Sequence, residues 1–205
     1  MNMRTILSLA ALVVSVSLVK ADILSEVPKN AQDELAEGQL VVKSQDVQGD
    51  PWPRLMLYQV IDCPPNLLWN LFNDYSAAPS YTPNLISATV VATNPDGSKD
   101  VEYTVKVPII QKATYTVRNT YSQKGSIRTV NWTLLKSPLA KSSDGSLRLE
   151  PYGDNQTLLC YTNLVVPITN LVAGLKGQAL QEAKNTVRAI KTEAERRAAA
   201  PNSKS

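Results

Sequence analysis

Cys63-Pro64-Pro65-Asn66-Leu67-Leu68-Trp69-Asn70-Leu71-Phe72-Asn73-Asp74-Tyr75 is the stretch of sequence that decides the fold. Two prolines open it, and proline is tolerated at a helix start although it cannot donate to a strand ladder. The apolar residues that follow predict a short helix over 66–73. The segments on both sides have strand character, so this helix interrupts a sheet. An apolar helix in that place is typical of a fold that shapes a pocket.

The first residues of the chain predict an export signal. Arg4 gives a positive start, residues 6–19 carry no charge, and Ala21 suits the position before a signal-peptidase cut. The uncharged run is shorter than the roughly twenty residues of a comfortable membrane span. Lys20 is an awkward neighbour to the cut, so an uncleaved anchor is the alternative. We expect residues 1–21 to be a signal peptide and the protein to be exported, either periplasmic or secreted.

Charge and composition exclude several function classes. Without Arg4 and Lys20, the 21 basic residues fall to 19 against 18 acidic ones, which is a formal charge of +1. This balance gives no electrostatic footprint for nucleic acid. The chain contains no histidine, which excludes a Ser-His or Cys-His nucleophile and the commonest metal ligand. We expect no metal, no cofactor and no nucleic-acid partner.

Two cysteines, Cys63 and Cys160, are the only thiols in the chain. An oxidising compartment outside the cytoplasm permits a disulfide between them. A bridge requires Cα atoms within about 7 Å of each other, and the sequence does not show whether they meet. Two buried free thiols are the alternative.

Most of the chain has strand periodicity. Strands are expected over 39–43, 55–62, 85–93, 100–109, 113–122, 127–136, 146–152 and 156–166, with a turn over 142–145 and a short helix over 28–37. The short loops between consecutive strands indicate antiparallel pairing. Val101, Tyr103 and Val105 alternate with Glu102 and Thr104, so one face of the sheet is apolar and must be covered.

The C-terminal residues 170–198 predict a long amphipathic helix that supplies this cover. Its apolar positions recur every three or four residues, at Val172, Leu175, Ala179, Ala183, Val187, Ile190 and Ala194. Part of this stripe is small, with Gly174 and Gly177 beside the two alanines. Small residues either leave space between helix and sheet or allow close backbone approach. The pattern alone does not choose between these interpretations.

The order of elements resembles a known superfamily. A strand, a helical break with Trp69 and Asp74-Tyr75, the segment Pro79-x-Tyr81-x-Pro83-Asn84-Leu85, six antiparallel strands and a long C-terminal helix are similar to the START and polyketide cyclase group, the helix-grip fold of the SRPBCC superfamily. The resemblance covers about residues 38–194. It implies an α+β domain in which a curved antiparallel sheet of about seven strands wraps around the C-terminal helix, in an exported bacterial-type member.

The resemblance also implies a domain organisation. After the signal peptide we expect a helical lead-in over 22–38, a START-like domain over 39–198 and a disordered tail over 199–205. A deep cavity between sheet and helix would hold an apolar molecule such as a lipid, quinone or sterol. The residues expected to line it are Trp69, Tyr75, Tyr81, Tyr103, Val105, Tyr115, Val117, Trp132, Leu149, Leu175, Ala179 and Ala183.

Two further functions stay open at this stage. Polyketide cyclases of this fold act through pocket shape and polar groups, so Tyr75, Tyr81, Tyr103, Glu102 or Arg118 could orient a carbonyl. A fully packed interior would instead make the chain an interaction domain. An apolar small molecule and a transient contact with a membrane are the expected partners. The sequence does not give the oligomeric state.

Overall fold

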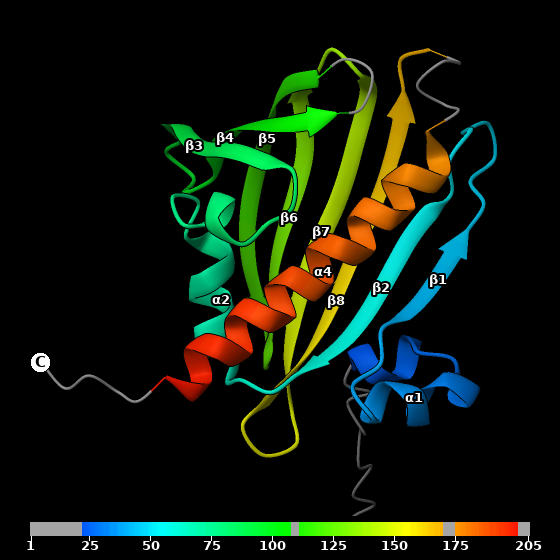
Figure 1. Ribbon diagram of the computed structural model, residues 1–205, viewed down its shortest axis with the longest axis vertical. Coiled ribbons are helices and arrows are strands. Elements are labelled where there is room, and N and C mark those ends of the chain that lie inside the picture. The colour runs from blue at the N-terminus through cyan, green and yellow to red at the C-terminus, as the bar shows by residue number, and fades with distance from the viewer. Residues whose placement is uncertain (1–21, 108–110, 170–174, 201–205) are drawn as a thin grey trace, which may run out of the picture.

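The computed structural model describes residues 22–107, 111–169 and 175–200, and in them a single eight-stranded antiparallel sheet curves around one long helix (Figure 1). The strands follow the spatial order β1-β2-β8-β7-β6-β5-β4-β3. Their bounds are β1 Val41–Gln45, β2 Arg54–Ile61, β3 Leu85–Thr93, β4 Lys99–Val107, β5 Gln111–Lys124, β6 Ile127–Lys136, β7 Ala140–Tyr152 and β8 Gln156–Pro167. The expected α+β helix-grip architecture is confirmed.

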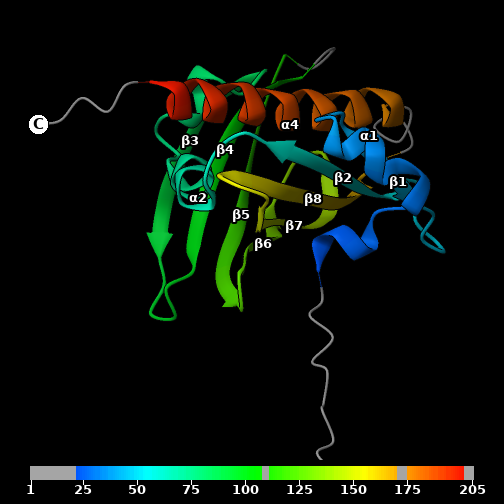
Figure 2. The same ribbon diagram turned by 90° about the horizontal axis from the view of Figure 1, so that it is seen from below.

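The C-terminal helix α4 (Lys176–Ala199) lies across one face of the sheet, and Figure 2 shows the sheet bending beneath it. Val187, Ile190 and Ala194 of α4 are almost fully buried. They pack in one cluster with buried residues of β2 and β7, including Leu57 and Leu149. Burying a valine or isoleucine side chain stabilises the folded state by about 1.5–3 kcal/mol. This half of α4 therefore anchors the helix on the sheet.

Helix α2 (Pro65–Asn73) follows β2 directly and closes one side of the concave face. Pro65 stands in the first turn, where its missing N–H leaves no helical bond unmade. Thr157 of β8 donates its hydroxyl to the Cys63 carbonyl at 2.7 Å and fixes the entry into the helix. Leu68 and Leu71 are buried in the same core cluster as α4. The short helix η3 (Ala78–Ser80) then leads into β3.

The opposite face of the sheet is covered by the N-terminal elements η1 (Ile23–Glu26), η2 (Lys29–Ala31) and α1 (Gln32–Ala36). Two short helices therefore stand where one helix over 28–37 is expected. Ile23 and Leu35 are fully buried against Tyr58, Val60 and Cys160 in a second core cluster. Because neighbouring residues of a strand face opposite ways, β2 and β8 serve both cores.

Strand β7 is the main departure from the sequence expectation. It begins at Ala140 and continues through residues 142–145, where a turn is expected, so the chain reverses earlier, between residues 136 and 140. Ser143 and Gly145 pair with Val165 and Asn163 of β8. Turn-forming residue types are tolerated here because pairing with β8, joined from Asp144 onwards by pairing with β6, outweighs their weak strand preference. The early start lengthens β7 but adds no strand, and the eight strands of the sheet match the eight expected segments, whereas the family resemblance implies about seven.

Both cysteines are free and buried, so the disulfide alternative is wrong. Cys63 belongs to the core beneath α4, whereas Cys160 belongs to the core beneath η1 and α1. The two thiols therefore lie on opposite faces of the sheet. Cys160 accepts a hydrogen bond from the Arg148 guanidinium at 3.1 Å, and Arg148 is also paired with Glu26 of η1.

Three sequence expectations fall on residues outside the described ranges. They are the signal peptide over 1–21, the start of the C-terminal helix over 170–174, and residues 201–205 of the tail expected over 199–205, whose first residue, Ala199, is the last residue of α4. Of the helices that the structure describes, none has the length and apolar content of a membrane span.

Candidate ligand-binding cavity

A cavity of about 450 Å³ lies between the concave face of the sheet and α4. Its walls come from α2, the segment leading from Tyr75 to Leu85, strands β4 to β8 and α4 as far as Ile190, with Trp52 contributed from the connection between β1 and β2. Most of the wall is apolar. A volume of this size falls within the range of pockets that enclose small molecules.

Ten of the twelve residues proposed from the sequence lie in the cavity wall. They are Tyr75, Tyr81, Tyr103, Val105, Tyr115, Val117, Trp132, Leu175, Ala179 and Ala183. Trp69 and Leu149 lie outside the wall. Leu149 is fully buried in the core beneath α4, and Trp69 packs on that core with its ring edge-to-face to Tyr121 at 6.1 Å. Neither side chain contributes to the cavity wall.

Helix α4 leaves space beneath one part of its length and packs closely on the sheet along another part. Ala179 and Ala183 line the cavity, so small side chains leave space along the first half of the helix. Val187 and Ala194 pack directly against the sheet along the second half. A methyl group on Gly177 would meet no atom within 4 Å, so close packing does not require a glycine there. The cavity exists because α4 contacts the sheet along only part of its length.

Aromatic rings build two sides of the cavity. Tyr103 of β4 stacks on Tyr115 of β5 with ring centroids 5.4 Å apart, and Tyr75 meets Tyr103 edge-on at 6.4 Å. Further along the sheet, Trp132 of β6 and Tyr161 of β8 lie 5.2 Å apart. These rings give an apolar surface with polar edges, which suits a ligand that is mostly apolar.

Strand β7 runs between Trp132 and Tyr161 and has no side chain where the indole ring crosses it. Gly145 of β7 is the cross-strand neighbour of Trp132, and a Cβ atom on it would lie 2.3 Å from the indole ring. Only glycine therefore allows the indole to cross β7 and reach Tyr161. The sequence pattern, which places a turn at this residue, gives no hint of this role.

A polar chain enters the cavity wall at Asn119, a residue that sequence reasoning missed. Asn119 is buried, and its side-chain amide donates to the Tyr75 hydroxyl at 2.9 Å. The Tyr75 and Tyr121 hydroxyls share a further hydrogen bond of 2.7 Å. Alternation along β5 places Asn119 on the same face as Val117, which is the signal that could have identified it. The chain gives one end of the cavity a fixed polar surface.

Exposed residues mark where the cavity opens to solvent. Pro83, Asn84, Lys106 and Gln178 line the cavity and are also exposed, and we call them the mouth. Asn84 adopts a left-handed backbone conformation with φ 60°, which asparagine tolerates better than most residues. Its side-chain amide donates to Glu182 of α4 at 2.9 Å, and its carbonyl accepts from the Lys106 amide at 2.8 Å. One side of the mouth is thereby tied to both the helix and the sheet.

The tyrosine hydroxyls of the cavity are weak acids. Burial raises the pKa of Tyr115 to about 12 and the pKa of Tyr103 well above its ordinary value. Burial also raises the pKa of Tyr81 to about 12, and its hydroxyl donates to the Leu71 carbonyl at 3.2 Å. These hydroxyls stay protonated at neutral pH, so they can orient a ligand by hydrogen bonding but are poor general bases. In the described part of the chain no cluster of cysteine, aspartate and glutamate side chains could hold a metal ion.

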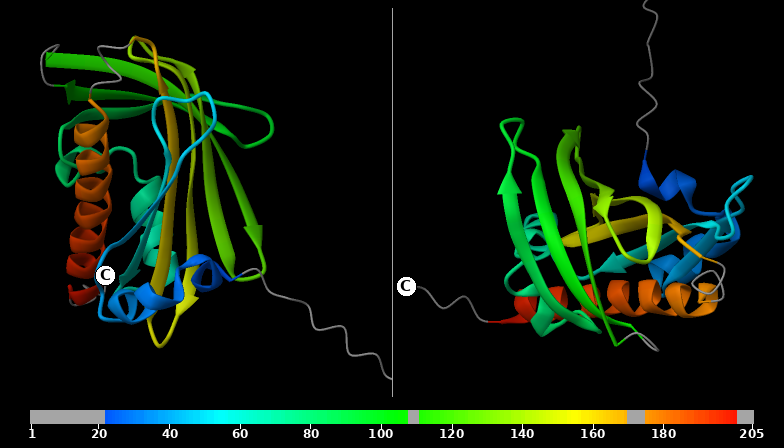
Figure 3. Two further views of the ribbon diagram at one scale, coloured as in Figure 1. Left: turned by 90° about the vertical axis from the view of Figure 1, so that its right-hand side faces the viewer. Right: turned by 90° about the horizontal axis from the view of Figure 1, so that it is seen from above.

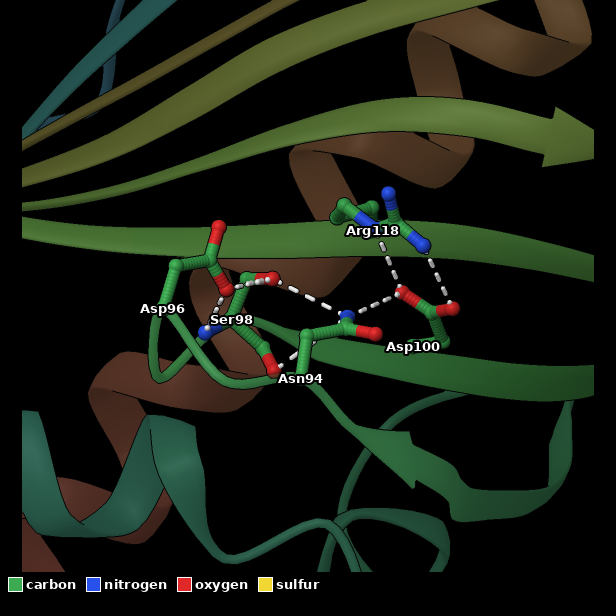
Figure 4. Close-up of polar contacts among 5 residues, drawn as sticks. All are labelled: Asn94, Asp96, Ser98, Asp100 and Arg118. Carbon is green, nitrogen blue, oxygen red and sulfur yellow. Dashed lines mark hydrogen bonds and ion pairs between the residues drawn. The ribbon is translucent and has the colours of Figure 1, made fainter.

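Two charged residues considered for a cyclase lie away from the cavity. Arg118 is on the outer face of β5 and forms a two-pronged ion pair with Asp100 at 2.7 and 2.9 Å (Figure 4). Asp100 also accepts from Asn94 in the turn between β3 and β4. Glu102 is exposed. The three tyrosines of that proposal line the cavity, whereas these two charges do not reach it.

Arg128 of β6 lies on the same face of the sheet as Trp69. Its guanidinium lies 5.8 Å from the centre of the Trp69 ring, and it shares strand parity with Val130 and Trp132. The side chain therefore covers the outer edge of the Trp69 cluster. Tyr161, Asn163 and Thr186 are further wall residues that the sequence reasoning missed, and alternation along β8 could have identified the first two.

No protein-family model and no curated protein sequence matches the chain. Solved structures do. A STAR-related lipid transfer protein from Xanthomonas axonopodis superposes with a TM-score of 0.65 at 12% identity, over 76% of this chain and 93% of that one. The chain has the START fold. Human StAR-related lipid transfer protein 5 gives 0.64 at 10% identity, over 78% and 83% of the two chains. The Zhui aromatase/cyclase from a Streptomyces species gives 0.61 at 20% identity, over 70% and 94%. The structural neighbours thus confirm the resemblance to the START and cyclase superfamily at the level of the fold.

Proposed function

We propose that this protein binds one apolar small molecule, a lipid, quinone or sterol-like compound, in the cavity beneath α4. The observation that carries the proposal is a 450 Å³ space with apolar and aromatic walls inside a domain whose cores are otherwise packed. The fold is shared with proteins described as lipid transfer proteins. Enclosing about ten methylene groups would supply a gross transfer term near 8 kcal/mol, before the costs of association.

The cavity favours a ligand with a long apolar body and one polar end. Tyr103, Tyr115 and Trp132 offer ring faces, whereas the chain from Asn119 to Tyr75 offers fixed hydrogen-bonding groups. Such groups orient a ligand without strong charge. A cyclase would need a proton acceptor at neutral pH, and the raised pKa values of the cavity tyrosines do not supply one. Binding is therefore the function that these walls support best.

We propose further that binding serves carriage or sequestration outside the cytoplasm. The support is the predicted signal peptide over 1–21, with its positive start and uncharged run. Cell fractionation followed by intact-mass measurement tests this part separately. A mature chain that begins at Asp22 in the exported fraction is expected. A full-length chain recovered only from the cytoplasm would refute it.

The binding proposal is tested by extracting gently purified protein with organic solvent and identifying the extract by mass spectrometry. One apolar compound per protein molecule is expected. Protein stripped of that compound should take up the neutral apolar fluorophore N-phenyl-1-naphthylamine. Ala179→Leu places extra carbon atoms in the cavity and should weaken uptake, whereas Ala199→Leu at the exposed end of α4 should not. Folded protein with empty extracts and no uptake of the fluorophore would overturn the proposal.

A further inference from the structure

One end of the sheet carries positive charges that have no ionic partner. At this end β4, β6 and β8 finish while β5, β7 and α4 begin, and we call it the mouth end because Lys106 of the mouth lies there. Figure 3 (right) looks onto it. Five exposed lysines occupy it, namely Lys106, Lys112, Lys136, Lys141 and Lys176. The ion pairs found in the described ranges all lie elsewhere.

The register of the sheet brings two of these lysines close together and increases their repulsion. Lys106 and Lys112 stand directly opposite each other on β4 and β5, and like charges in that position destabilise a strand pair. The nearest carboxylates along β7 and α4 are Asp144 and Glu182, and Glu182 already accepts a hydrogen bond from Asn84. Five lysines against two carboxylates leave an excess of three positive charges. An external anion would relieve this repulsion.

Two other regions within the described ranges carry balanced or paired charges. The hairpin between β1 and β2 reaches the same end of the sheet with two basic and two acidic residues, Lys43, Asp46, Asp50 and Arg54. Towards the opposite end, Arg118 pairs with Asp100 and Arg196 with Glu193. The mouth end differs from both regions in its unpaired lysines.

Apolar side chains are exposed at the same end. Ile86 beside the start of β3, Leu135 near the end of β6 and Ile168 after β8 are 40%, 47% and 44% exposed. They are half of the large apolar side chains exposed in the described ranges. The cavity itself reaches this end, because Val107 and Leu139 lie in its wall. Lysines, exposed apolar residues and the cavity opening thus lie together.

We propose that the mouth end docks onto the surface of an anionic phospholipid bilayer. This inference rests on the proposed function, since an apolar ligand that is insoluble in water would enter or leave the cavity from a membrane. Lysines near an anionic surface are attracted to its lipid headgroups, and Leu135 and Ile168 can enter the interfacial region. Docking in this orientation places the cavity opening against the bilayer.

The spread of the lysines favours a surface over a small anion. Lys112 and Lys141 belong to β5 and β7, which β6 separates, and Lys176 begins α4. A bilayer offers many headgroups in one plane to charges spread in this way. Exposed leucine and isoleucine side chains gain nothing from a nucleic-acid backbone, which is polar throughout. A membrane is the partner that uses both kinds of residue.

Sedimentation with lipid vesicles tests the proposal. Ligand-free protein is mixed with vesicles of phosphatidylcholine alone or of phosphatidylcholine containing phosphatidylglycerol. Binding to the anionic vesicles is expected, and it should weaken as salt rises. A lysine near such a surface raises the partition coefficient about fivefold. Lys112→Gln combined with Lys136→Gln should therefore lower it by about 25-fold.

Lys29→Gln combined with Lys124→Gln is the matched control, because it removes the same charge from exposed sites away from the mouth end. This variant should bind anionic vesicles nearly as well as the original protein. Equal losses in the two variants, absence of binding to anionic vesicles, or equal binding to both vesicle types would overturn the inference. Lysine-dependent binding to duplex DNA without vesicle binding would also overturn it. Because the assay needs no ligand, vesicle binding by a protein that takes up no apolar fluorophore would sink the proposed function and leave docking standing.

Discussion

Replacing Gly145 by alanine should remove the freedom that lets the Trp132 indole lie across β7. The new Cβ atom would stand 2.3 Å from the ring and 2.5 Å from the Thr162 carbonyl oxygen. Carbon atoms in contact prefer about 3.5–4.0 Å, so the ring must retreat by about 1.2 Å or more. The retreat carries the ring away from β7 and into the cavity, and it disturbs the 5.2 Å contact with Tyr161.

Overpacking of this kind typically costs about 1–3 kcal/mol of the free energy of unfolding. Urea unfolding followed by tryptophan fluorescence measures this cost. Titration with N-phenyl-1-naphthylamine reports the accompanying loss of cavity space as a weaker affinity. Both changes are expected from the one substitution, because the same ring packs on the sheet and lines the cavity.

Gly177→Ala is the matched control with the opposite sign. A Cβ atom there would meet no atom within 4 Å, and the residue lies in the first turn of α4. Alanine favours helix over glycine by up to about 1 kcal/mol, so this variant should be slightly more stable and should bind the fluorophore unchanged. If Gly145→Ala unfolds at the same urea concentration as the original protein, the indole does not rest on Gly145 and the argument fails.

Three further predictions concern the cores, the thiols and the end of α4. Leu149→Ala should lower the free energy of unfolding by about 2–5 kcal/mol. It should leave fluorophore affinity nearly unchanged, because Leu149 is fully buried outside the cavity wall. A large loss of affinity with little destabilisation would contradict this placement. Burial raises the pKa of the Cys63 thiol to about 11, so at pH 8 about one thiol in a thousand is ionised. Alkylation of Cys63 should therefore require unfolding in urea. Rapid labelling of the native protein, or an intact mass showing a Cys63–Cys160 disulfide, would refute this prediction. Arg196 and Arg197 lower the pKa of Glu193 from 4.5 to about 2. The ionised Glu193 side chain therefore stabilises the folded protein fully above pH 4.5, and this stabilisation is lost as the pH falls through 2. Because these arginines are partly exposed, Glu193→Gln should cost under about 1 kcal/mol at pH 7, and acid titration of both proteins should show the difference vanishing rather than growing.

The fold was open to prediction from the sequence because it depends on repeated patterns. Alternation such as Val101, Tyr103 and Val105 sets which face of a strand is buried, and the prolines before α2 set where the sheet is interrupted. Several residues contribute to each of these signals, so one exception does not alter the result. The order of elements then leaves few ways to cover the apolar face.

The details that failed depend on single residues and their partners. Gly145 has the composition of a turn but lies in a strand, because an indole from β6 needs the space above it. Asn119 is polar yet faces the interior, because the Tyr75 hydroxyl accepts its amide. Sequence patterns rank residues by polarity and do not show such partners. The same limit applies to Trp69, which has the character of a cavity aromatic but is used to pack α2 on the core.

The placement of the cavity follows from a difference in packing between the two halves of α4. Its second half carries Val187, Ile190 and Ala194 into the core and holds the helix on the sheet. Its first half presents Ala179 and Ala183 to the cavity, and Ala183 also contacts the edge of the core. A hollow under the whole helix would leave nothing to hold it, and full contact would leave no cavity. Because the anchored half lies away from the mouth end, the half that faces the opening can admit a ligand without loosening the packed core.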